Sequence, residues 1–195
     1  MALILLFACS LSAHAVYVAD VGDGTGAASD GPPPPALTAE GTLILSEIVD
    51  HADDTASFVE LRNASSDPLT LDGSWRLRRY TSSAPVESGL PALDVPPGGT
   101  VVIAADQTGF SDAFGVSPDG VSAIATGNGD DAYALIRDGE VVDLFGEESV
   151  DGTDTPWDYT NGVAARNGSV TVGSTTWLAE EWTLTPGTDA ATPGS

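Results

Sequence analysis

From Thr42 onward the sequence consists of short apolar segments with a period of two residues, separated by turn residues. Successive side chains of a strand point to opposite faces, so this alternation predicts β-strands. The segments with this pattern are 43–49, 57–62, 75–80, 100–104, 132–137, 140–145 and 174–178. One helical turn is expected at 110–114, where Phe110 and Phe114 could face the core together. The chain is therefore expected to be all-β.

Two turn sequences refine this expectation. Asp138-Gly139 separates segments 132–137 and 140–145. Asp-Gly suits a type I′ turn, which needs positive φ at both central residues, so these segments should form a hairpin. Pro96-Pro97-Gly98-Gly99 precedes 100–104, whose continuous apolar run predicts a strand that is covered on both faces.

The charge balance excludes a class of partner. The 195 residues contain 29 Asp and Glu against six Arg and no Lys, which gives a formal net charge of -23. Nucleic-acid binding depends on Lys and Arg contacts to phosphate, so no nucleic-acid partner is expected. Anionic lipid is disfavoured for the same reason. With 42% hydrophobic residues the chain can still bury one core, and its 22 Gly and 13 Pro suit an all-β protein with many turns.

Residues 1–15 have the pattern of a signal peptide. An apolar run at 2–8, too short to span a bilayer, is followed by Ala13-His14-Ala15, a small-x-small cleavage pattern. We expect a secreted, periplasmic or cell-surface protein without a transmembrane helix in the mature chain. Leu6-Phe7-Ala8-Cys9 also resembles a lipobox, in which Cys9 would carry a lipid anchor. The alternative is that Cys9 is a small apolar residue of the discarded signal.

The remaining chain divides by composition. Residues 16–40 are rich in Gly, Pro and Asp and are expected to form a disordered linker. Residues 41–185 are expected to form the folded domain, and residues 186–195 a flexible tail. Cys9 is the single cysteine, so the folded domain contains no disulfide.

Three blocks, in this order and spacing, carry a resemblance to a known family. The first comprises Leu45-Ser46-Glu47-Ile48-Val49, Phe58-Val59-Glu60-Leu61-Arg62-Asn63 and residues 69–75; the second is 93–103; the third is Gly127-Asn128-Gly129-Asp130-Asp131-Ala132-Tyr133-Ala134-Leu135, followed by Gly139, Val141, Val142, Asp143 and Gly146. Together they resemble the lamin tail domain of secreted bacterial proteins, and Trp157, Arg166 and Trp177 fall where the family usually has an aromatic, an arginine and an aromatic residue. The resemblance implies an immunoglobulin-like β-sandwich that acts as a non-catalytic module.

The inventory of reactive residues also argues against catalysis. After the signal peptide, His51 is the single histidine, and no Gly-x-Ser-x-Gly motif is present. One histidine without cysteine cannot supply a zinc site. No catalytic residue is therefore expected.

Calcium is the metal that the sequence could support, because it accepts carboxylate and carbonyl oxygens from loops. The two clusters of candidate ligands are Asn128, Asp130 and Asp131, and Glu147, Glu148, Asp151 and Asp154. The alternative interpretations are a turn held by short polar side chains and a solvated acidic loop, without any cofactor.

Two further groups could form a ligand surface. Trp157, Tyr159 and Trp177 could stack on sugars, or they could be core anchors. Arg76 and Arg78 share one face of a strand and could bind an anion or polymer, or neutralise neighbouring carboxylates.

The sequence therefore predicts a non-catalytic extracellular or cell-surface module with a binding or structural role. Its partner would be a protein or polysaccharide at the cell surface. A carbohydrate-binding module and a calcium-stabilised surface protein are the alternatives.

Overall fold

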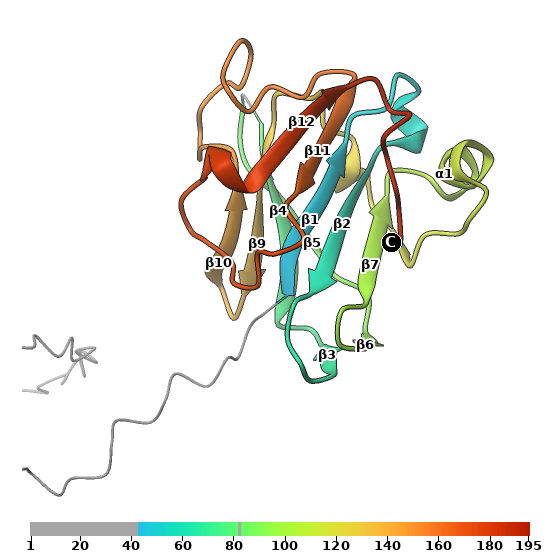
Figure 1. Cartoon of the computed structure of the whole chain (residues 1–195), viewed down its shortest axis with the longest axis vertical. Helices are drawn as coiled ribbons and strands as arrows, with labels where there is room; N and C mark the ends of the chain where they lie inside the picture. Colours follow the sequence, from blue (N-terminus) through green and yellow to red (C-terminus); the bar gives the residue numbers. More distant parts are fainter. Residues whose placement is uncertain (1–42, 82) are drawn as a thin grey trace, which may run out of the picture. The chain divides into compact units, whose positions relative to one another are not determined.

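The protein forms an immunoglobulin-like β-sandwich, as the strand pattern predicted (Figure 1). The computed structural model describes residues 43–81 and 83–195. The expected signal peptide, Cys9 and the linker lie outside the described residues. Within them, strands are arranged in sheets of six, four and two strands.

The six-stranded sheet has the order β12-β11-β1-β2-β7-β8. Its strands are β12 (Trp182–Pro186), β11 (Gly162–Arg166), β1 (Leu43–Val49), β2 (Phe58–Asn63), β7 (Thr100–Ala104) and β8 (Gly120–Val121). All neighbours are antiparallel except β7 and β8. Strands from both ends of the domain sequence therefore meet in one layer.

The opposing four-stranded sheet has the order β10-β9-β4-β5. Its strands are β10 (Glu140–Phe145), β9 (Ala132–Arg137), β4 (Trp75–Tyr80) and β5 (Val86–Gly89), and a small sheet pairs β3 (Leu69–Leu71) with β6 (Leu93–Val95). The hairpin of β9 and β10 is confirmed. Asp138 and Gly139 have φ values of 51° and 87°, as a type I′ turn requires.

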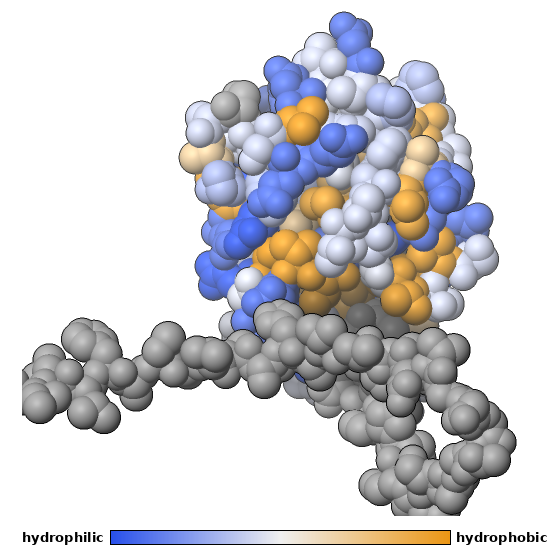
Figure 2. Space-filling view, turned by 90° about the vertical axis from the view of Figure 1, so that its left-hand side faces the viewer, coloured by the Kyte–Doolittle hydropathy of each residue, from blue (hydrophilic) through white to orange (hydrophobic). Residues whose placement is uncertain are grey.

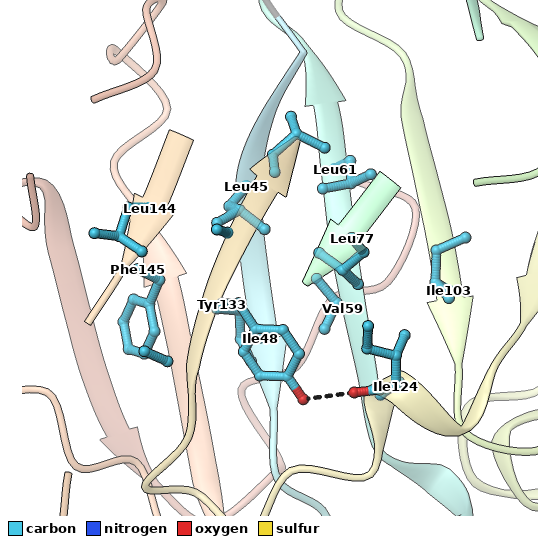
Figure 3. Close-up of a cluster of buried hydrophobic side chains, with 14 of the residues drawn as sticks. Leu45, Ile48, Val59, Leu61, Leu77, Ile103, Ile124, Tyr133, Leu144 and Phe145 are labelled. Carbon is cyan, nitrogen blue, oxygen red and sulfur yellow. Dashed lines mark hydrogen bonds between the residues drawn. The ribbon is translucent and has the colours of Figure 1, made fainter. Parts of the chain in front are cut away.

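The core lies between the two main sheets. Leu45, Val59, Leu61 and Leu77 have almost no exposed surface, and Figure 3 shows them converging from both sheets. The buried Tyr133 hydroxyl donates a 3.0 Å hydrogen bond to the carbonyl of Ile124, in the short 3-10 helix η2 (Ala123–Ala125). Each large apolar side chain buried in this way contributes about 1.5–3 kcal/mol to folding.

The six-stranded sheet also carries a small apolar cluster on its outer face. Helix α1 (Gln107–Phe114) covers it, and Phe110 packs edge-on against Phe58 with ring centroids 5.5 Å apart. Val102 and Ala104 of β7 belong to this cluster, so the prediction of a strand covered on both faces is confirmed. The helix is longer than the expected turn because Asp106 caps its first amides.

Two strand predictions need correction. Segment 174–178 is not a strand, because the amide of Ser174 donates to the Asp143 carboxylate and its hydroxyl to the carbonyl of Thr176. The strand of this region is β12, which pairs with β11. Strand β2 begins at Phe58, one residue later than expected, because η1 (Asp54–Ala56) and Ser57 precede it.

Candidate binding site

A polar pocket of about 290 Å³ lies where β4 ends and β9 begins. We call it the loop-end pocket. It brings Asn128, Asp130 and Asp131 of one predicted acidic cluster together with Asp151 of the other. The remaining predicted ligands, Glu147, Glu148 and Asp154, do not line it. The pocket is thus built from the end of β4 and from two loops that the β9–β10 hairpin separates in sequence.

Glycine shapes the first of these loops. Gly129 has φ of 85°, and a Cβ atom there would lie 2.2 Å from the Cα of Thr160. The carbonyl of Gly129 accepts a 2.8 Å hydrogen bond from the amide of Tyr159. At Gly127 a Cβ would lie 2.7 Å from the Tyr133 hydroxyl. These close approaches explain why the loop needs glycine at both positions.

Arg79 forms one wall of the pocket. Its Nη1 lies 3.4 Å from Oδ2 of Asp131 and also donates to the carbonyl of Thr126. Burial raises the pKa of Asp131, and the Arg79 guanidinium partly offsets this effect. The Nε atom of Arg79 is buried and makes no hydrogen bond within the described part of the chain. Arg79 therefore fastens the loop to the end of β4.

The pocket carboxylates already accept hydrogen bonds from the protein. The Thr153 hydroxyl donates to Asp130 and the Thr153 amide to Asp151, both at 3.0 Å. The hydrogen bond from the Thr153 amide lowers the pKa of Asp151. Among residues 43–81 and 83–195, no three His, Cys, Asp or Glu side chains form a group that could hold a metal ion. Calcium binding stays a prediction.

Of the aromatic residues that could either stack on sugars or anchor the core, most lie in the core. Trp157 and Tyr159 are 1% and 4% exposed, and both pack edge-on against Phe145. The interpretation of Trp157 and Tyr159 as part of a sugar-binding surface is therefore wrong, because their rings are buried in the core. Trp182 is buried in the same core. Trp177 is half-buried against the same core.

Arg76 and Arg78 share a partner on the neighbouring strand. Each donates through Nε to Glu87 of β5 at 2.8 Å, and this pairing lowers the pKa of Glu87. The arrangement favours the interpretation that these arginines neutralise carboxylates. Of the six arginines, Arg62 alone forms no ion pair within the described residues.

His51 lies in the turn after β1, where its Nδ1 accepts a 3.0 Å hydrogen bond from the amide of Asp53.

The alternating pattern of β4 did not indicate that Arg79 would line the pocket. Arg79 lies an even number of positions from the core residues Trp75 and Leu77, so a regular strand would point its side chain to the core face. Its position at the strand end lets its side chain reach Thr126 beyond the core.

Hydrophilic residues form a band across the side of the domain that carries β10, with apolar groups on either side (Figure 2). Within the described residues, no helix is both long and apolar enough to span a membrane.

Comparison with known protein families shows which family the chain is related to. The family model of the Lamin Tail Domain matches residues 36–149, which is more than half of the chain. The comparison with curated proteins gives no match. The match ends after β10, whereas β11 and β12 complete the six-stranded sheet beyond it. The chain belongs to the lamin tail domain family.

Proposed function

We propose that the protein is a non-catalytic module that acts outside the cell or at its surface, with a binding or structural role. The immunoglobulin-like fold of the lamin tail family supports the assignment as a module. The observation that carries the binding role is the loop-end pocket, a recess whose wall residues are fixed by hydrogen bonds and glycine contacts. Preorganised polar groups of this kind favour binding, because few side chains lose conformational freedom when a ligand binds.

The chemistry of the pocket indicates what it would bind. Asn128 offers both donors and acceptors, whereas Asp130 and Asp151 offer acceptors. Such a lining suits the hydroxyl or amide groups of a surface polysaccharide or protein. It does not suit phosphate or other anions, which the three aspartates would repel.

The experiment measures binding of the full chain to purified surface polysaccharides and surface proteins. Asn128→Ala and Asp151→Asn change exposed pocket residues, and Asp112→Asn changes an exposed residue of α1 as a control. Both pocket variants should bind at least about tenfold more weakly, which corresponds to about 1.4 kcal/mol, with unchanged melting temperatures. Binding that neither variant weakens would contradict the role of the pocket, and turnover of a bound polymer would contradict a non-catalytic module.

Export is supported by the signal-like residues 1–15 and is tested separately. Mass spectrometry of the mature protein should find Val16 at its N-terminus, or a lipid on Cys9 if the lipobox is used. A mature chain that still begins at Met1 would contradict export by this route.

Calcium stabilisation is the second candidate function. It is favoured by one observation: the loop-end pocket contains members of both predicted acidic clusters. The hydrogen bonds from Thr153 to Asp130 and Asp151 weigh against it, since calcium would compete with donors already in place.

A further inference from the structure

Two buried carboxylates face each other on the outer side of the six-stranded sheet. Glu47 of β1 and Glu60 of β2 are direct cross-strand partners, and each is 4% exposed. Like charges directly opposite each other destabilise a sheet, and burying a charge is costly unless it is paired or hydrogen-bonded. The free-energy cost of burying this pair therefore depends on the residues that cover it and donate hydrogen bonds to it.

The end of the chain supplies that cover. The amide of Thr192 donates to both carboxylate oxygens of Glu47, at 3.1 and 3.2 Å, and the amide of Gly194 donates to Glu60 at 2.7 Å. Ala191 packs against the outer apolar cluster. Figure 1 shows this segment, in dark red, running down beside α1 to the C-terminus. We call residues 187–195 the C-terminal strap; they are most of the segment that the sequence predicted to be a flexible tail.

Other charged groups near the pair form their hydrogen bonds with other partners, while the Arg62 guanidinium lowers the pKa of Glu60 and the Asp119 carboxylate raises it. Arg62 donates to the carbonyls of the 168–170 loop, Arg166 to other carboxylates, and Asp119 accepts a backbone amide. Asp189 of the strap is exposed, and Ser195 lines the same hollow. Within the described residues, neither glutamate forms an ion pair. A second hydrogen bond to Glu60 comes from the hydroxyl of Ser46, at 2.6 Å.

We infer that Glu47 and Glu60 form a proton-linked clamp for the C-terminal strap. The strap is seated while the pair holds a proton and leaves the sheet when both carboxylates are ionised.

The linkage follows from burial. Loss of water raises the pKa of Glu47 from 4.5 to about 7, and it also raises the pKa of Glu60. The amides of Thr192 and Gly194 lower the pKa of the carboxyl that each contacts, but the loss of water is the larger effect on both. Departure of the strap returns water to the pair, so seating is coupled to net proton uptake. The equilibrium constant for seating should fall by up to about tenfold per pH unit as the pH rises from 4.5 to 7, and it should level off above 7.

The test follows the backbone amides of Thr192 and Gly194 by ¹⁵N NMR in the full chain from pH 5.0 to 8.5. The order of the strap should decrease between pH 5.0 and about pH 7, with its midpoint inside this range, and should then stay constant to pH 8.5, while β1 and β2 stay ordered. In Glu47→Gln the neutral amide still offers an acceptor oxygen, so the strap should stay seated throughout. Glu140→Gln, an exposed glutamate of β10, is the control and should keep the wild-type midpoint.

A strap that is equally ordered at pH 5.0 and 8.5 in the wild type would overturn the inference, as would an unchanged midpoint in Glu47→Gln. If Glu47→Gln does not fold, Thr192→Pro provides the test because it removes the amide that Glu47 accepts. The strap should then be mobile at every pH, and the carboxyl signal of Glu47 should titrate closer to its ordinary pKa of 4.5. A titration of Glu47 that stays near pH 7 in this variant would also overturn the inference.

Discussion

Asp143 and Arg166 form a buried ion pair that joins the two main sheets. Nη1 of Arg166, on β11, lies 2.5 Å from Oδ2 of Asp143, on β10, and the two side chains are 1% and 0% exposed. Asp143 also accepts the amides of Leu45 and Ser174, each at 2.8 Å. The second arm of Arg166 reaches Glu181. The Asp143 carboxylate thus accepts hydrogen bonds from β1, from β11 and from the loop before β12, and it connects both sheets and this loop.

Breaking this pair should destabilise the domain strongly. Asp143→Asn leaves the Arg166 guanidinium buried beside a neutral amide, which should lower the free energy of unfolding by about 3–5 kcal/mol. Urea denaturation measures the loss. Glu87→Gln is the control, because its partner Arg76 is 43% exposed and exposed pairs contribute about 0–1 kcal/mol. Equal losses in the two variants would show that the buried pair is not a principal connection between the sheets.

The close packing of Gly129 gives a second prediction. Gly129→Ala would place a Cβ against the backbone of Thr160 and would strain a residue at positive φ. It should destabilise the domain by at least about 1 kcal/mol, since positive φ alone costs a non-glycine residue about that much. Gly168→Ala is the matched control, because Gly168 has no neighbouring atom within 4 Å of its Cβ position. Thermal melting compares them, and identical melting temperatures would contradict the packing argument.

Local sequence signals predicted the central strands well. The bounds of β1, β4, β7, β9 and β10 agree with the expected segments, because each combines alternation with a clear turn or an apolar run. Strand β11 was missed because Gly162–Arg166 contains small residues and has little apolar alternation. Its pairing with β1 joins residues more than a hundred positions apart, which no local pattern reports.

Burial of Asp143 could not be read from alternation either. The β9–β10 register shifts between Val141 and Asp143, so the strand bulges and the side-chain parity changes. Local sequence patterns were equally unable to show which candidate site residues are buried. Turn residues marked the loop of Asn128 and Asp130, whereas the fold decided that Trp157 enters the core.

The position of Trp157 leads to a third prediction. Trp157→Ala removes a buried ring that packs against Phe145, and it should destabilise the domain by about 3–5 kcal/mol. Val172→Ala, at a residue that is 66% exposed, should change stability by less than about 0.5 kcal/mol. Denaturant titration of both variants checks this. A Trp157→Ala variant of wild-type stability would place the ring at the surface and would restore it as a candidate sugar platform.

The raised pKa of Glu47 predicts how stability changes with pH. A carboxyl with a raised pKa in the folded state stabilises that state most below its unfolded value of 4.5, and this contribution is lost as the pH approaches about 7. Glu47→Gln lacks this dependence. Between pH 5 and 8 the wild type should therefore lose about 2 kcal/mol more unfolding free energy than the variant. Parallel stability profiles from urea titrations would contradict it.

We propose that the domain is a scaffold held together by its own buried side chains and that it needs no metal ion to fold. Thermal melting of the full chain in calcium, in EDTA and in NaCl of matched ionic strength tests it most directly. We predict the same midpoint in calcium and in matched NaCl, and no loss of stability in EDTA, because bulk screening acts for either salt. A midpoint that rises specifically with calcium would contradict the claim and would establish a metal ion as part of the folded state.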